Sequence, residues 1–255
     1  MIDVHSCCQS WGVEVKLFTH FSGCDAVTRE SSKDGEQFSR AKWLLSLVLC
    51  CACIGCGASE DPAAYKRLKG KNIMVMQNAG ETYQIIMSDV PFTDEVAADI
   101  AKLGHLKNLN FKGSDVTDET FKKAASGLDP ISVILSDTEV TDDAMNAMSG
   151  YGRIEAIFLT NTGITDEGLK PIGKLGSITE LNLEGTKISS EGLKHLTGMS
   201  KLKRLVLNNT AIDDAGLENL KSLSDLSKID AVDTQITQAG IKAIRDAIPG
   251  LAIEQ

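Results

Sequence analysis

The sequence predicts an α/β solenoid in which short strands and short helices alternate and stack in successive rungs. Two observations carry this prediction. A 24-residue period runs without insertion from residue 82 through the rest of the 255-residue chain. All seven cysteines lie within the first 56 residues, so the repeats contain no thiolate metal site and no disulfide framework. We therefore expect burial of apolar side chains alone to hold the repeats together.

Composition and charge limit the classes of protein that fit. Hydrophobic residues make up 42% of the chain and charged residues 24%, which is typical of a globular protein. The net charge is −9 and the isoelectric point is about 5.0. Binding to nucleic acid phosphates requires concentrated Lys and Arg, so nucleic acid is not expected as a partner.

The N-terminal 56 residues do not belong to the repeats. Residues 1–39 show no sustained periodicity, and we expect an unstructured prefix that reflects a gene start placed too far upstream. In residues 40–56, Arg40 and Lys42 precede the apolar run WLLSLVLCCACI. About 12 apolar residues are too few to span a bilayer, which needs roughly 20. A basic flank, a short apolar run and then small residues form the layout of an export signal.

The end of this segment resembles a bacterial lipoprotein signal, because Gly55 and Cys56 are followed at once by polar residues. The resemblance implies acylation of Cys56, which becomes the new N-terminus. The protein would then be anchored by lipid in the cell envelope, facing the periplasm or the exterior. That family prefers Leu where this chain has Cys53. Cys53 is an alternative acceptor, and a merely apolar or buried segment is the alternative without lipid.

Residues 57–81 are expected to tether and cap the solenoid. Residues 57–60 form the tether, and a short helix begins at Asp61, with Pro62 at its first position. Residues 73–87 read as a hairpin with strands at 73–76 and 83–87. Because the end of a repeat stack would otherwise expose its core, this hairpin is interpreted as the N-terminal cap.

Three columns of the repeat are apolar in all seven blocks, which start at residues 82, 106, 130, 154, 178, 202 and 226. Positions four and six alternate with period two, as a strand with one buried face requires. Position four holds Ile85, Leu109, Val133, Ile157, Leu181, Leu205 and Ile229. Position six holds Met87, Phe111, Leu135, Leu159, Leu183, Leu207 and Ala231. Position eleven holds Phe92, Val116, Val140, Ile164, Ile188, Ile212 and Ile236.

Three further columns predict the turn and the start of the helix. Position eight is Gly, Asn or Asp in every block, which predicts a tight turn after each strand. Position nine is Ser or Thr in six blocks, and we expect its hydroxyl to bond the loops of neighbouring rungs. Position twelve is Thr, Ser or Asp and predicts a helix N-cap, followed by acidic residues such as Asp166. Leu169, Ile172 and Leu175 then form the inward stripe of the helix.

Blocks four to six resemble leucine-rich repeats. They read IEAIFLTNTGITDEGLKPIGKLGS, ITELNLEGTKISSEGLKHLTGMSK and LKRLVLNNTAIDDAGLENLKSLSD, a variant of the form LxxLxLxxTxITDxGLxxLxxLxx. The resemblance covers residues 82–255, with a truncated last strand around 251–253. It implies a right-handed solenoid with a parallel β-sheet on the concave face and short helices on the convex face.

The repeats offer little chemistry. His105 and His195 are four rungs apart, roughly 20 Å at the spacing of strands, so they cannot share a metal or a proton. The Asp residues recur by repeat position, as turn and cap residues do, and equivalent side chains are too far apart to converge on calcium. We expect no enzyme activity, no cofactor and no metal.

The remaining candidate is the exposed face of the sheet, at positions three, five and seven. Small side chains, Ser132 and Ala156, flank Ile134 and Phe158, whereas blocks five to seven carry charges. We expect a non-catalytic module that binds a protein or peptide here, with a structural or glycan-binding envelope component as the alternative. The expected contact residues are Ile86, Asn110, Ile134, Phe158, Asn182, Arg204 and Val206.

Overall fold

A computed structural model describes residues 61–71, 73–78, 82–87, 90–104 and 106–255. The expected prefix at residues 1–39, the signal at 40–56 with Cys53 and Cys56, and His105 therefore lie outside the described residues. The division of the chain at these boundaries stays a prediction.

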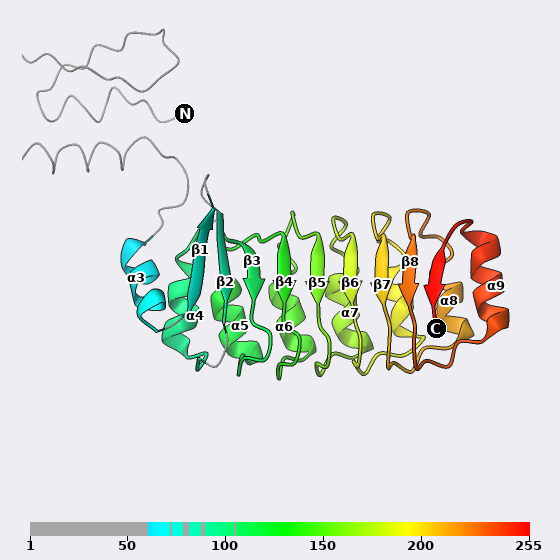
Figure 1. Cartoon of the computed structure of the whole chain (residues 1–255), viewed down its shortest axis with the longest axis horizontal. Coiled ribbons are helices and arrows are strands. Elements are labelled where there is room, and N and C mark those ends of the chain that lie inside the picture. The colour runs from blue at the N-terminus through cyan, green and yellow to red at the C-terminus, as the bar shows by residue number, and fades with distance from the viewer. Residues whose placement is uncertain (1–60, 72, 79–81, 88–89, 105) are drawn as a thin grey trace, which may run out of the picture. The chain divides into compact units, whose positions relative to one another are not determined.

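Nine strands of the described chain form one sheet, in the order of the sequence (Figure 1). All neighbouring strands from β2 onward pair in parallel, whereas β1 pairs antiparallel with β2. The strands are β1 (Met74–Asn78), β2 (Thr82–Ile86), β3 (Leu106–Asn110), β4 (Ser132–Ile134), β5 (Ala156–Phe158), β6 (Glu180–Asn182), β7 (Arg204–Val206), β8 (Lys228–Asp230) and β9 (Ala252–Glu254).

A helix follows each strand from β2 to β8 and lies behind the sheet in Figure 1. The predicted solenoid, with a parallel sheet on one side and helices on the other, is confirmed. In block five the helix is a short 3₁₀ turn. The helical elements are α3 (Pro62–Gly70), α4 (Asp94–Ala101), α5 (Asp118–Ala125), α6 (Asp142–Ala147), α7 (Asp166–Ile172), η2 (Gly192–Leu196), α8 (Asp214–Glu218) and α9 (Gln238–Ala247).

The three apolar columns form the core between the sheet and the helices. Every position-four side chain is fully buried, and no residue at positions six or eleven is more than 4% exposed. At the N-terminal end the core is aromatic. The ring of Phe111 meets those of Phe92 and Phe121 edge to face, with centroids 5.0 and 6.3 Å apart. Each block therefore buries its own columns against its neighbours, as the period predicts.

The predicted tight turn is confirmed at position eight, and its backbone is left-handed there. Asp137, Asn161, Asn209 and Asp233 have φ between 54° and 58°, and the glycines of blocks two and five have φ of 67° and 65°. Asn and Asp tolerate this conformation better than other residues with a side chain, which explains their recurrence.

The expectation for position nine is wrong. Each hydroxyl bonds the carbonyl oxygen three residues earlier in its own block rather than a neighbouring rung. Thr162, for example, donates to Leu159 O at 2.7 Å, and Thr186 donates to Leu183 O at 2.6 Å. The tight turn folds the hydroxyl back over its own strand end. The backbone already bonds the next rung there, as Gly113 N does to Ser136 O at 2.9 Å.

Position twelve caps the helix as predicted in most blocks. The side chains of Thr165, Asp213 and Thr237 accept hydrogen bonds from backbone N–H groups in the first turn. The same residues also accept or donate across the stack. Asp142 accepts from both Thr165 N and Thr165 Oγ1, at 2.8 and 2.6 Å.

The same Asp bond recurs between other blocks, and we call it the Asp ladder. It joins position thirteen of one block to position twelve of the next. Its Asp pairs are Asp118–Thr141, Asp142–Thr165, Asp166–Ser189 and Asp214–Thr237. The hydrogen bonds from Thr237, first from its hydroxyl and then from its backbone, hold the pKa of Asp214 below its usual range.

The expected helix and hairpin are present at the N-terminal end of the stack. Asp61 caps α3 by accepting from Ala63 N at 2.9 Å. Arg67 then donates to both oxygens of the buried Asp99 on α4, at 2.8 and 2.6 Å. This bidentate pair fastens α3 over the end of the core, where Ala64 and Leu68 are fully buried.

Candidate functional site

The side of the sheet that faces away from the helices, here called the open face, presents two straight rows of side chains. The strand register aligns equivalent positions of successive blocks. The position-five row continues as Ile86, Asn110, Ile134, Phe158, Asn182, Val206, Asp230 and Glu254. The position-three row continues as Gln84, Asn108, Ser132, Ala156, Glu180, Arg204, Lys228 and Ala252.

Ile134 and Phe158 are direct neighbours in the position-five row, on β4 and β5. Both side chains are half-buried rather than fully exposed, and Ser132 and Ala156 beside them are half-buried too. Neighbouring strands lie about 4.8 Å apart, so the two apolar side chains stand in contact range. They form one apolar spot, flanked along the row by Asn110 and Asn182.

Val206 does not offer the surface that we expected. It is only 4% exposed, although it stands on the open face between Asn182 and Asp230. Arg204, from the same strand, donates to Asp230 Oδ2 on the neighbouring strand β8. Ile86 is half-buried and Arg204 is exposed. The role of these residues in binding a partner stays a prediction.

The charged end of the open face is an ion-pair network centred on Asp230. Arg204 Nη2 lies 2.8 Å from Asp230 Oδ2, and its Nη1 lies 3.1 Å from Glu180 Oε1. Lys228 Nζ lies 3.1 Å from both Asp230 Oδ1 and Glu254 Oε1. Burial acts to raise the pKa of Asp230, but the hydrogen bonds from Arg204 and Lys228 outweigh it and hold that pKa low. In this network two cations, Arg204 and Lys228, pair with three carboxylates, those of Glu180, Asp230 and Glu254.

Comparison with known proteins agrees with the repeat geometry. The Leucine Rich repeat family matches residues 177–196 and 198–221, which cover the fifth block and most of the sixth. These two segments are similar to leucine-rich repeats. The other blocks share their period, core columns and turn, so the leucine-rich repeat architecture extends along the described stack.

Two solved structures from Listeria monocytogenes have a similar fold. An internalin (inlF) is 16% identical with a TM-score of 0.55, and the match covers 67% of this chain and 52% of that one. Internalin C2 is 19% identical with a TM-score of 0.52, and the match covers 68% and 79%. The match thus spans about half the length of the first internalin. No curated protein sequence matches it.

The sequence reasoning missed two methionines of the open face. Met74 and Met76 on β1 pair in register with Ile86 and Gln84, so they extend both rows by one strand. They are 55% and 39% exposed, which makes them the most exposed large apolar side chains at this end of the described repeats. The alternation Met-Val-Met in β1 indicates that the two methionines share one face of the sheet. The sequence analysis treated the hairpin only as a cap and therefore did not place its side chains on the open face.

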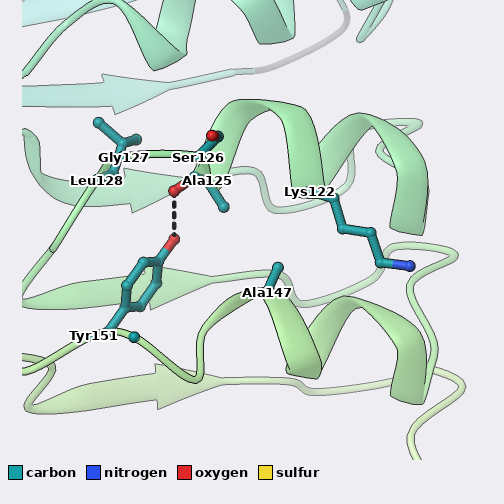
Figure 2. A pocket seen from close by; sticks show the side chains of 8 residues that line it. Lys122, Ala125, Ser126, Gly127, Leu128, Ala147 and Tyr151 are labelled. Atoms are coloured by element: carbon teal, nitrogen blue, oxygen red, sulfur yellow. Dashed lines mark hydrogen bonds between the residues drawn. The ribbon is translucent and has the colours of Figure 1, made fainter.

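A shallow hollow of about 560 Å³ lies beside Tyr151, between the C-terminal ends of α5 and α6 (Figure 2). Gly127 and Tyr151 share position 22, where blocks one, four, five and six bury Leu or Met, and Leu128 enters the core from the next position. The Tyr151 hydroxyl donates to the Ala125 carbonyl at 3.4 Å. Burial, followed by the charge of Asp129, raises the pKa of Tyr151, so it stays protonated.

The walls of this hollow do not form a reactive site. Lys122 is its charged side chain, and it is exposed and points away from Tyr151 in Figure 2. We interpret the hollow as space left because Gly127 has no side chain to pack against the ring of Tyr151.

The remaining candidate groups are isolated in the described part of the chain. His195 is half-buried on η2, and His105 lies outside the described residues. Within the described ranges, no group of three or more His, Cys, Asp or Glu side chains is arranged to hold a metal ion. No helix within those ranges has the length and hydropathy needed to cross a bilayer.

Proposed function

We propose that this leucine-rich repeat chain is a non-catalytic module that binds a protein or peptide on its open face. The observation that carries the proposal is the in-register pair of Ile134 and Phe158, which is flanked along its row by Asn110 and Asn182. An aromatic anchor inside a polar rim is the usual composition of an interface hot spot. Repeat stacks provide extended surfaces of this kind.

The chemistry of the open face favours a protein partner over a glycan. Glycan sites commonly stack sugar rings on several aromatic side chains. Among the described positions three, five and seven, Phe158 is the one aromatic residue. A glycan array and a pull-down from an envelope extract separate the two candidates, and retention of a glycan with no protein retained would favour the alternative.

We further propose that the protein is exported and anchored by a lipid on Cys56, in the cell envelope. The supporting observations are the basic and apolar layout of residues 40–56 and the short polar tether that follows. Residues 57–60 span at most about 14 Å, so the repeats would stand close to the membrane surface.

Mass spectrometry of the native N-terminus tests this anchoring. We expect an acylated Cys56 and no peptide from residues 17–29. Cys56→Ser should abolish partitioning into detergent, whereas Cys53→Ser should leave it unchanged. Recovery of the upstream peptide from native protein, or membrane partitioning that survives Cys56→Ser, would show that the anchor is wrong.

Phe158→Ala tests the binding face. The substitution should weaken capture of the retained partner by about 2 kcal/mol or more, while stability changes by less than about 1 kcal/mol because the ring is outside the core. Val232→Ala is the control, since Val232 is exposed at the far end of the same sheet. A melting temperature that falls by many degrees with capture unchanged would make Phe158 a packing residue.

A further inference from the structure

The two edges of the sheet are protected to different degrees. At one edge, β9 has three residues, and its Glu254 pairs with Lys228. At the other edge, β1 has the sequence MVMQN, five residues with no charge and no proline (Figure 1). Natural sheets normally block their edges with short strands, charges or proline, because a free edge is a template for another strand. β1 has none of these protections.

The side chains of β1 suit a pairing strand on the open face. Met74 and Met76 are exposed there, and Val75 between them points toward the core. Within the described residues, the backbone of β1 forms no hydrogen bond with any segment other than β2. Within the described residues, the outward N–H and C=O groups of alternate β1 residues thus have no strand partner. They lie beside two flexible apolar side chains of a kind that adapts to different partners.

The helix next to this edge indicates the charge of its partner. α3 packs against β1 and α4 at the end of the stack, and with its C-cap Lys71 it carries four exposed cations. Arg67 pairs with Asp99 and Lys71 with Glu95, which leaves Lys66 and Lys69. Among the described residues, no acidic side chain pairs with Lys66 or Lys69. Two copies of this chain joined edge to edge would bring two cationic helices together. A partner segment with acidic residues would instead be attracted.

We propose that β1 accepts an extended segment of a partner protein as a tenth strand of the sheet. The segment carries apolar side chains at alternate positions, which pack on Met74 and Met76, and acidic residues that lie near α3. Main-chain hydrogen bonds supply the affinity and the alternate side chains supply the specificity. This site does not depend on the Phe158 surface, which lies on β5.

The probe for the test is the synthetic peptide DEVTITVTDE, added to the full chain and followed by amide hydrogen exchange. We expect slower exchange in β1 alone among the strands. Two further peptides carry N-methyl groups on alternate residues, one set on each edge of the extended peptide. One set should weaken binding at least tenfold and the other should leave it unchanged, because only one edge of the peptide can face β1.

Variants locate the site. Met76→Lys should weaken peptide binding at least tenfold, whereas Val232→Lys, the same change at an exposed apolar position far from β1, should not. Phe158→Ala should also leave peptide binding unchanged, so failure of the edge site and failure of the proposed open-face site can be told apart. A peptide with lysines in place of its acidic ends should bind more weakly, with the difference shrinking at high salt.

Three results would overturn the proposal. Both N-methylated peptides could bind as well as the parent, which would exclude strand pairing. The peptide could slow exchange in β4 and β5 rather than in β1. The β1 amides that point away from β2 could already be protected before peptide is added. That would mean that a second copy or the chain's own N-terminal residues occupy the edge. Sedimentation at several concentrations distinguishes these two occupants.

Discussion

At some repeat positions the type of residue depends on its contacts with the neighbouring rung. The helix glycines at position fifteen show this directly. A Cβ on Gly168, Gly192 or Gly240 would overlap the carboxylate of the Asp ladder from the preceding block, and a Cβ on Gly216 would lie 2.9 Å from Ser190 Oγ. Glycine leaves room for the ladder at these four positions, at the cost of weaker helix propensity.

Leu183→Ala should be strongly destabilising. Leu183 is fully buried at position six in the middle of the stack, and removing a large buried side chain leaves a cavity. The expected loss in the free energy of unfolding is about 2–5 kcal/mol. Urea denaturation measures it, with Val232→Ala, 41% exposed in the wild type, as a control that should change by about 0.5 kcal/mol or less. A loss as small as the control's would place Leu183 outside the core.

At the scale of elements, hydrogen bonds between blocks supplement the non-directional apolar contacts of the stack. The Asp ladder joins the N-terminus of each helix to the cap of the next. Between blocks five and six the two residue types are exchanged. Ser190 occupies position thirteen and Asp213 position twelve, and Ser190 Oγ donates to Asp213 Oδ1 at 2.5 Å. The connection between blocks five and six still pairs one carboxylate with one hydroxyl. The pairing is therefore kept even where the two blocks exchange the residues that supply these groups.

Asp166→Ala should destabilise the chain by about 2 kcal/mol, because Ser189 would lose hydrogen bonds of 2.8 and 2.7 Å to a charged acceptor. Asp143→Ala is the matched control. Asp143 also lies in the first turn of its helix, but it is exposed and holds no rung-to-rung bond. Its loss should cost only the dipole contribution, below about 1 kcal/mol. Equal losses for the two variants, measured in urea, would exclude a special role for the ladder.

The joint between α3 and α4 should depend on pH. The hydrogen bond from Arg67 holds the pKa of Asp99 below its usual value against the effect of burial. Because the folded-state pKa is lowered, the stabilisation is present above the unfolded pKa of about 4 and is lost as pH falls through the lower folded value. The difference in melting temperature between wild type and Asp99→Asn should therefore close below about pH 4. Glu95→Gln, at an exposed ion pair with Lys71, should show little difference at any pH.

At the scale of the whole molecule, the stack is a linear array whose blocks contact only their neighbours. Its N-terminal blocks differ from the rest. Asp94, at the ladder position of block one, pairs with Lys123 at 2.6 Å rather than with the next cap. Blocks two and three replace the regular position-22 pattern with Gly127 and Tyr151, and blocks one to three have no glycine at position fifteen.

We expect the array to open first at these N-terminal blocks. Native-state hydrogen exchange should give the lowest opening free energies in blocks one to three and the highest in blocks five and six. The reason is the missing ladder bond of block one and the irregular position 22 of blocks two and three, since burial is similar along the stack. Exchange that proceeds faster in blocks five and six than in block one would show that this order is reversed.

The sequence by itself determined what each rung requires of its own residues. Period-two columns such as Leu181 and Leu183 predict the buried strand face, Asn161 predicts the left-handed turn, and Thr165 predicts the helix cap. The hairpin and α3 follow from equally local signals. These features could be predicted because each depends on the conformation of a few consecutive residues, and a repeated pattern supplies the same evidence several times.

Only the tertiary structure decided how side chains divide between their own rung and the next. It assigned the Thr162 hydroxyl to its own strand and gave Asp166 a partner in the following block. It also buried Val206 on the open face and brought Met74 into that face. These outcomes depend on the direction and reach of side chains after the rungs have stacked. Residue types that recur at one repeat position predict that each rung has the same structure. The hydrogen-bond partner of each atom depends on the distance between stacked rungs.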